Sequence, residues 1–364
     1  MHFDLEQADA AGDLRTDICV IGGGAAGITL ARRMLELGHE VVLLESGGLD
    51  YEKSTAGLNV GQNVGQAYYA LDEARLRFFG GSTAIWGGRL AELDPVDLER
   101  RDWAPNSGWP ISWAELNRYY PAARAIFGEP EQAATLDELR TAGAPLPHFS
   151  PENLEVGVWT FDGRFNRFVF EACGDLVSHP RCTIVTHATV TGIRLSANGR
   201  HVERVTAESL IRRRLTISAN AFVLAAGGLE NPRLLLASND VAPQGIGNTY
   251  DQVGRYFMEH PHARGGRVVG GQAWSLLKAF GRTHRLGARE LAGLIKPSAQ
   301  AQARSGILNS SLTIAARQPA GAAPNWGMAA YSSLKQGMAP SRGGRALWMA
   351  TKKAAKWAQR RTDP

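Results

Sequence analysis

The chain has 364 residues, of which 44% are hydrophobic and 21% are charged. These proportions fit a globular protein long enough for two domains and exclude a chain dominated by disorder. The net charge of +5 has one source, because residues 335–361 contain eight basic residues and no acidic one, which leaves the rest slightly acidic. A nucleic-acid-binding protein would concentrate basic residues on a folded module, and none is evident, so we expect no nucleic-acid partner.

Cysteine usage and hydrophobic stretches predict the compartment. Cys19, Cys173 and Cys182 are an odd number and lack the spacing of metal ligands, so we expect reduced thiols, a cytoplasmic location and no bound metal. The first 17 residues contain no apolar core of a signal peptide. No stretch approaches the roughly 18 apolar residues that cross a bilayer, so we expect no transmembrane segment.

Residues 16–46 predict a strand, a helix and a second strand that together hold a dinucleotide. The apolar run at 17–21 favours a buried parallel strand. It is followed by Gly22, Gly24 and Gly27, which have the spacing G-x-G-x-x-G. In that motif the first glycine allows a tight turn, the second a close approach to a pyrophosphate, and the third close packing of helix on strand. The alternative interpretation is an ordinary glycine-rich turn.

The residues after this motif favour the dinucleotide over the ordinary turn. Good helix formers continue from 25 to 37, and Gly38 ends the predicted helix. A second buried strand is predicted at 41–44, and Glu45 follows it, 23 positions after Gly22. An acidic side chain at that position accepts hydrogen bonds from a ribose diol.

Two later stretches are rich in small residues. Residues 78–89, FFGGSTAIWGGR, are typical of backbone that lies against a flat or phosphorylated ligand, with a turn cluster as the alternative. Residues 221–228, AFVLAAGG, predict a buried strand followed by a helix over 230–238. A second strand and glycine turn brings another backbone segment to a flavin, so FAD is favoured over NAD. No arginine follows Glu45 to take a 2′-phosphate, which disfavours NADP.

The remaining elements are predicted from shorter patterns. A β-meander that returns the chain to the nucleotide domain is predicted from strands at 183–190, 193–196, 202–209 and 215–218. Two further strands are predicted at 307–315 and 326–334. Residues 345–361 predict an amphipathic helix, either solvated or bound to a membrane surface or a partner.

With these stretches in order, the sequence resembles the glucose-methanol-choline (GMC) family of FAD-dependent oxidoreductases. The resemblance is carried by IGGGAAG with LLES, FFGGSTAIWGGR, SGWPIS, FVLAAGGLENPRLLLAS at 222–238 and VGRYFMEHP at 253–261. The pattern GGST-x-x-W-G-G together with GWPIS most resembles the bacterial sugar and polyol branch.

The resemblance implies a set of cofactor-binding residues. Those expected around the pyrophosphate and the isoalloxazine are Gly22, Gly24, Gly27, Gly81, Ser82, Thr83, Trp86, Gly87, Ala226 and Gly227. Those expected around the adenosine are Glu45 and Ser46 at the ribose and Val190, through its backbone, at the adenine. Members of the sugar branch that bind flavin covalently use a histidine just before the loop tryptophan, where this chain has Ile85. Isoleucine has no nucleophile, so the FAD is expected to be non-covalent.

The resemblance also implies an α/β fold with two domains. We expect a Rossmann-like FAD-binding domain over 1–128 and 171–258. A second α+β substrate domain with an antiparallel sheet is expected over 129–170 and 259–364. The C-terminal third of the family pattern has no match, so we expect the chain to be truncated or one part of a split enzyme whose second polypeptide completes it.

The catalytic base is not assigned by this pattern. The family uses a histidine with a histidine or asparagine partner near its C-terminus, and no such pair is found. His260, in the segment EHP, is either a base, because histidine titrates near neutral pH, or a packed or hydrogen-bonded residue.

The resemblance implies an FAD-dependent oxidoreductase that acts on the CH–OH group of a sugar, polyol or other alcohol by hydride transfer to flavin N5. One alternative is a non-catalytic or partner-dependent flavin-binding subunit. Another is a different two-domain flavoenzyme such as a monooxygenase, which GWPIS and ENPRLLL disfavour.

Overall fold

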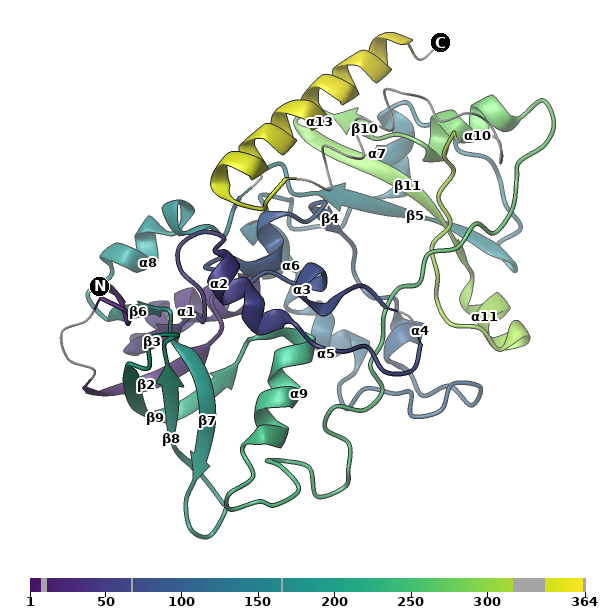
Figure 1. Ribbon diagram of the computed structural model, residues 1–364. Coiled ribbons are helices and arrows are strands. Elements are labelled where there is room, and N and C mark those ends of the chain that lie inside the picture. The colour runs from purple at the N-terminus through teal and green to yellow at the C-terminus, as the bar shows by residue number, and fades with distance from the viewer. Residues whose placement is uncertain (8–11, 67, 165, 317–337, 363–364) are drawn as a thin grey trace. The chain divides into compact units, whose positions relative to one another are not determined.

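The computed structural model describes residues 1–7, 12–66, 68–164, 166–316 and 338–362, and these form two compact units (Figure 1). The first unit contains the described residues of 1–86, 166–261 and 325–364, and the second those of 87–165 and 262–324. No helix among the described residues is long and apolar enough to cross a bilayer.

A seven-stranded sheet organises the first unit, in the order β1-β6-β3-β2-β9-β8-β7. The strands are β1 His2–Asp4, β2 Asp13–Ile21, β3 Val41–Leu44, β6 Cys182–Thr186, β7 Thr189–Leu195, β8 Val202–Glu208 and β9 Arg214–Leu224. Neighbours from β1 to β9 are parallel, whereas β8 is antiparallel to both β9 and β7. All four residues of β3 are buried, as expected for a parallel strand covered on both faces.

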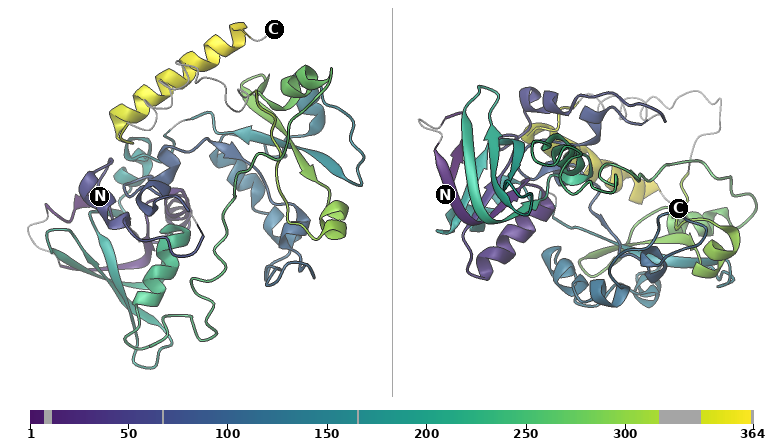
Figure 2. Two further views of the ribbon diagram at one scale, coloured as in Figure 1. Left: turned by 45° about the vertical axis from the view of Figure 1, so that its right-hand side comes forward. Right: turned by 90° about the horizontal axis from the view of Figure 1, so that it is seen from below.

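Helices α1, α8 and α9 pack on this sheet. The helices of the first unit are α1 Ala25–Glu36, α2 Lys53–Ala56, α3 Leu71–Ala74, α8 Gly174–Ser178, α9 Gly227–Ala237 and α13 Arg342–Thr362, with 3₁₀ turns η1 Gly57–Asn59, η2 Gly81–Ala84 and η3 Phe170–Ala172. Helix α1 packs on β2 and β3, and Ile28, Ala31 and Leu35 are its buried apolar residues beside Gly27. Helix α9 lies beside β7 (Figure 2).

The second unit is built on a four-stranded antiparallel sheet, β10-β11-β5-β4. Its strands are β4 Arg89–Leu90, β5 Leu154–Phe161, β10 His284–Leu286 and β11 Arg289–Pro297. Its helices are α4 Pro95–Leu98, α5 Trp113–Asn117, α6 Tyr120–Ile126, α7 Leu136–Thr141, α10 Ala273–Phe280 and α11 Ala299–Ser305. Helices α7 and α10 pack on β11, where Leu139 and Phe280 are buried.

The predicted fold class is confirmed: a Rossmann-like α/β sheet accompanies a separate antiparallel sheet. One local difference lies in β9, a single strand where the sequence predicted strands at 215–218 and 221–228. Polar Ser218 and Asn220 interrupt the apolar pattern, but the pairing with β2 continues through Ala219 and Ala221.

Other differences concern two predicted strands and the domain boundaries. Residues 307–315 were predicted as a strand but make only a single bridge, between Leu312 and Ile295. The predicted strand at 326–334 lies outside the described residues. The compact units also differ from the predicted domain boundaries, since 87–128 is grouped with the second unit and α13 with the first. The assignment of substrate binding to the second domain stays a prediction.

Candidate functional site

A cavity of about 460 Å³ lies at the carboxyl ends of β2, β3 and β9 in the first unit. Parallel strands present their carboxyl ends at one edge, which is where α/β sheets bind ligands. The cavity is lined by the turn after β2, the end of β3, the η2 loop, the turn between β6 and β7, the start of α9 and residues 257–259.

The three glycines of the first turn have different surroundings. Gly22 has φ +114°, and a Cβ there would lie 2.5 Å from the carbonyl oxygen of Ala225. A Cβ on Gly27 would lie 2.0 Å from the carbonyl oxygen of Gly22, so helix and strand pack in contact there. A Cβ on Gly24 would meet no atom within 4 Å, although Gly24 lines the cavity. The protein itself fills the space at Gly22 and Gly27, whereas the space at Gly24 is open to the cavity.

The GGST loop is joined to this first turn. The backbone N–H of Gly80 donates to the carbonyl oxygen of Gly23 at 2.7 Å, and Gly80 forms an isolated parallel bridge with Gly24. The hydroxyl of Thr83 donates back to the Gly80 carbonyl at 2.6 Å, and Ser82 Oγ accepts from the N–H of Leu76 at 3.1 Å. Two glycine-containing turns thus form one continuous backbone wall of the cavity.

Glu45 braces the other side of the first turn. Its Oε2 accepts from the N–H of Gly23 and its Oε1 from the N–H of Gly47, both at 2.9 Å, and the residue is buried. Burial raises the pKa of the Glu45 carboxyl, and these N–H donors together with nearby Arg77 act against that rise. Each carboxylate oxygen keeps a further lone pair, so Glu45 can also accept from a ligand hydroxyl.

Ser46 continues the wall from Glu45 toward the turn between β6 and β7. Its Oγ lies 2.6 Å from the hydroxyl of Thr189 and accepts from Arg77 Nη1 at 2.8 Å. Thr189 and Val190 line the same end of the cavity, which is where the adenosine was expected.

The structure brings most of the predicted cofactor residues together. The predicted residues that line the cavity are Gly22, Gly24, Glu45, Ser46, Gly81, Ser82, Thr83, Val190, Ala226 and Gly227. The described residues that line the cavity do not include Gly27, Trp86 or Gly87. Gly27 is buried beneath the turn, Trp86 is the last residue of the first segment of the first unit, and Gly87 begins the second unit.

A charged cluster on the cavity wall was not predicted. Glu230, in the first turn of α9, accepts from Arg75 Nη2 at 2.7 Å, Arg77 Nη2 at 2.9 Å and Arg233 Nε at 2.7 Å. All four side chains line the cavity. A signal was present in the sequence, because RLR directly precedes the GGST loop and ENPR follows the second glycine turn, each placing charge beside a buried segment.

His260 lies on an exposed segment at the rim of the cavity. Its side chain is 85% exposed and pairs with the carboxylate of Glu259, which also accepts from the Tyr68 hydroxyl at 2.6 Å. The hydrogen bond from Tyr68 and those from His260 lower the pKa of Glu259 to about 2. His260 is therefore hydrogen-bonded and exposed, and its role stays a prediction; among the described lining residues there is no histidine.

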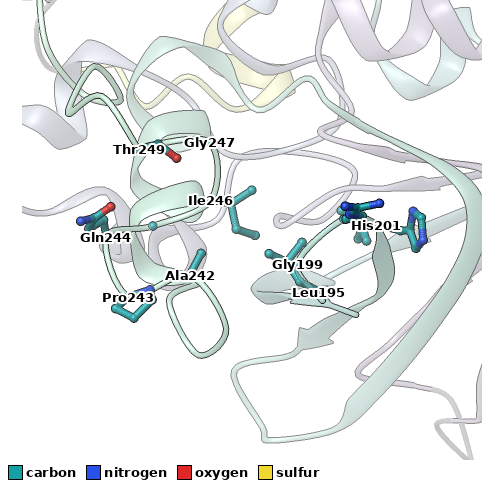
Figure 3. Close-up of a pocket in the computed structure, with 12 residues that line it drawn as sticks. Leu195, Gly199, His201, Ala242, Pro243, Gln244, Ile246, Gly247 and Thr249 are labelled. Carbon is teal, nitrogen blue, oxygen red and sulfur yellow. The ribbon is translucent and has the colours of Figure 1, made fainter. Parts of the chain in front are cut away.

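A second hollow of about 540 Å³ lies elsewhere in the first unit, between the β7–β8 turn and the loop at 242–249 (Figure 3). Its polar side chains include Arg200, His201 and Gln244, which are exposed. None of the cofactor residues predicted from the sequence is among its described lining residues.

Comparison with known proteins identifies the family to which the chain belongs. The family described as FAD dependent oxidoreductase matches residues 17–312. The 2-methyl-1,2-propanediol dehydrogenase of Mycolicibacterium austroafricanum is 25% identical over 311 residues, which cover 68% of this chain and 55% of that protein. The fructose dehydrogenase large subunit of Gluconobacter japonicus is 54% identical over 46 residues, which cover 12% of this chain and 8% of that protein.

Among solved structures, pyridoxine 4-oxidase from Mesorbium loti has 23% identity and a TM-score of 0.43, covering 61% of this chain and 51% of that one. The chain spans about half the length of the curated relatives that it matches along most of its own sequence. The glycine turns, the acidic residue after β3 and the family match agree with one another. The chain therefore belongs to the FAD-dependent oxidoreductases and is related to the GMC family.

Proposed function

We propose that the chain binds FAD non-covalently in the cavity at the carboxyl ends of β2, β3 and β9, as part of an enzyme that oxidises the CH–OH group of a sugar, polyol or other alcohol. The observation that carries this proposal is the open space over Gly24, on a wall where the N–H of Gly80 joins the two glycine turns and where a Cβ on Gly22 or Gly80 would overlap backbone. The relatives add support, since their names include a diol dehydrogenase and a fructose dehydrogenase subunit.

The residues present fit FAD in a defined order. The diphosphate would lie against Gly24 and the N-terminus of α1, where helix N–H groups favour an anion. Ala226 and Gly227, before and at the start of α9, would approach it from the other side. Glu45 and Ser46 would hold the ribose, and the backbone at Val190 would contact the adenine. Ile85 provides no group for a covalent bond to the flavin.

When bound, FAD supplies the hydride acceptor for the oxidation of an alcohol. The reaction also needs a base within hydrogen-bond reach of the substrate hydroxyl. Among the described residues that line the cavity there is no histidine, so the chain's own residues bind and orient the cofactor without an assigned proton acceptor. That observation favours a second candidate function, a flavin-binding subunit whose base is supplied by a partner polypeptide.

An absorption spectrum of the purified chain, before and after incubation with FAD, tests the cofactor assignment. We expect a flavin spectrum that dithionite bleaches, and flavin that is released into the supernatant by acid precipitation because the link is non-covalent. Protein without bound flavin would contradict the proposed cofactor. Flavin that stays in the acid pellet would contradict the non-covalent link.

An anaerobic panel of sugars, polyols and simple alcohols separates the two candidate functions. Bleaching of the flavin by one of these substrates favours an oxidoreductase that is active by itself. If no substrate bleaches flavin that dithionite reduces, the partner-dependent subunit is favoured, and co-purification should identify a second polypeptide that restores bleaching. Rapid NADPH oxidation would instead indicate a monooxygenase-like flavoenzyme.

A further inference from the structure

Two segments far apart in the sequence place four charged side chains on one wall of the FAD cavity. Arg75 and Arg77 precede the GGST loop, and Glu230 and Arg233 lie on α9. The hydrogen bond between Arg75 and Glu230 joins residues 155 positions apart. The Glu230 side chain is only 10% exposed, so this carboxylate is the buried centre of the cluster.

The cluster has more positive than negative charge. Three guanidinium groups share the single carboxylate of Glu230, which leaves a local surplus of two positive charges. Two other acidic residues line the cavity: the charge of Glu45 acts on Arg77, and Glu259 bonds to Tyr68 and His260. Glu230 has one carboxylate for three guanidinium groups, so the cluster keeps guanidinium donors that can bind an anion.

The hydrogen bonds of the three arginines show which one can bind that anion. Each guanidinium nitrogen of Arg75 and Arg77 already donates to the protein, through Glu230, Leu71, Asn59 and Ser46. Arg233 donates to Glu230 through Nε, and its two Nη groups have no hydrogen-bond partner among the described residues. Its side chain is 58% exposed and lines the cavity.

The position of Arg233 on α9 directs this free edge toward the helix N-terminus. Side chains on an α-helix tilt toward its N-terminal end, so Arg233 extends back over Glu230, three residues earlier. The residues at that end, Ala226 to Gly228, line the same cavity. A guanidinium held at Nε presents two parallel Nη donors, which match the oxygens of a phosphate.

We propose that Arg233 is the side-chain cation that binds the diphosphate of the dinucleotide, and that Glu230 is a positioning residue that holds it in place. This inference rests on the proposed function, which places FAD in this cavity. It adds a charged side chain to a set of predicted cofactor residues in which only Glu45 was ionisable and none was cationic.

Binding of ADP and adenosine to the flavin-free chain tests the role of Arg233, because only ADP carries the diphosphate. Isothermal titration should show that Arg233→Gln weakens ADP binding about tenfold to hundredfold, the range of a lost charge-assisted hydrogen-bond pair. FAD binding should weaken similarly, whereas adenosine binding should stay unchanged. Arg233→Lys keeps the charge but loses the fork, so its ADP affinity should be intermediate.

Arg33→Gln is a matched control, because Arg33 pairs with Glu36 on α1 at the same i, i+3 spacing and is outside the described lining set. It should bind ADP as the unmodified chain does. The inference is overturned if Arg233→Gln binds ADP with unchanged affinity, or if it loses ADP and adenosine affinity equally. A chain that binds neither FAD nor ADP before any substitution would contradict the proposed function instead.

A double-mutant cycle tests the positioning role of Glu230. If Glu230 acts through Arg233, then Glu230→Gln should weaken ADP binding clearly in the unmodified chain but much less in the Arg233→Gln background. Equal effects in both backgrounds would show that Glu230 acts independently and would overturn its positioning role. Thermal unfolding of each flavin-free variant confirms that folded protein is compared; if Arg233→Gln does not fold, Arg233→Lys carries the comparison.

Discussion

At the scale of single residues, the glycines of the first turn have separable functions. Gly27 allows α1 to touch the turn after β2, because a Cβ there would overlap the carbonyl oxygen of Gly22. Gly24 faces open space in the cavity. The sequence motif predicted this division: the packing role of Gly27 is seen in the structure, and the role of Gly24 toward a pyrophosphate stays a prediction.

Substituting these glycines should therefore separate stability from cofactor binding. Gly27→Ala should lower the free energy of unfolding of the flavin-free chain by about 1–3 kcal/mol or more, the cost of overpacking. Gly24→Ala should change that free energy by less than about 0.5 kcal/mol but weaken FAD binding at least about tenfold, because its methyl group would lie where the diphosphate approaches. Denaturant unfolding and FAD titration measure the two effects.

Gly57→Ala is the control for this pair, since a Cβ at Gly57 also meets nothing within 4 Å and Gly57 is outside the described lining set. It should leave both stability and FAD affinity unchanged. Loss of FAD affinity without loss of stability in Gly27→Ala, or the reverse pattern in Gly24→Ala, would contradict these separate roles.

At the scale of secondary-structure elements, His187 ties β1 to the start of α2. Its Nδ1 lies 2.8 Å from Asp4 of β1 and its Nε2 lies 2.8 Å from Glu52, the residue before α2. Burial by itself lowers the pKa of His187, but the hydrogen bonds and charges of Glu52 and Asp4 outweigh it and raise that pKa above 6.5.

The raised pKa gives His187 a pH-dependent contribution to stability. Protonated His187 stabilises the fold fully below the unfolded pKa of about 6.5, and this contribution is lost as pH rises through the higher folded pKa. We therefore expect His187→Asn to cost more free energy of unfolding at about pH 5.5 than at about pH 9, where both proteins hold a neutral residue. Asparagine tolerates the positive φ of +52° at this position.

Denaturant unfolding of both proteins across this pH range measures the difference. His39 is exposed and its side chain makes no hydrogen bond among the described residues, so His39→Asn serves as the control substitution. A cost for His187→Asn that is constant with pH, or that grows at high pH, would contradict the charged bridge.

The C-terminal helix shows what periodicity can and cannot predict about an element. A helix was predicted over 345–361, and α13 spans Arg342–Thr362. Arg345, one of its basic residues, is buried, pairs with Asp50 at 2.7 Å and lies with its guanidinium carbon 5.1 Å from the Phe78 ring centre. The charge pattern gave no sign that Arg345 would be buried. A membrane-surface or partner-binding role for this helix stays a prediction.

At the scale of the whole molecule, the three cysteines report on unfolding of the first unit. Cys19, Cys173 and Cys182 are free and buried, and burial raises the pKa of their thiols to about 12, about 11 and about 11 respectively. The thiolate is the reactive form, so the folded protein should react slowly with iodoacetamide at about pH 8. Complete alkylation is expected only in denaturant, as measured by mass spectrometry.

FAD should slow this alkylation if it binds the folded unit. Because a ligand of the native state reduces the open population in proportion to its concentration over Kd, a tenfold increase in FAD well above Kd should slow the reaction about tenfold. Adenosine at a concentration far below its Kd is the control and should leave the alkylation rate unchanged. Alkylation of any cysteine at the rate of a small free thiol would contradict burial. The cytoplasmic location stays a prediction that cell fractionation can test.

The sequence by itself determined the strand, glycine turn, helix and strand of residues 16–46, the order of the later motifs and, through them, the cofactor class. These features depend on periodicity and turn chemistry within about 30 residues, which a sequence displays directly. It did not indicate β11, whose central residues 291–295 are all apolar and buried under helices, so they lack the alternation of a half-exposed strand.

Only the tertiary structure decided which distant side chains share the cavity wall. Arg77 and Glu230 are 153 positions apart, and their contact requires β9 to pair with β2 so that α9 begins beside the first glycine turn. Strand order is set by the total free energy of packing the sheet and its helices, which no local pattern contains. The glycine turns are therefore evident from the sequence alone, whereas the position of Arg233 on the wall of the same cavity is evident only once the chain is folded.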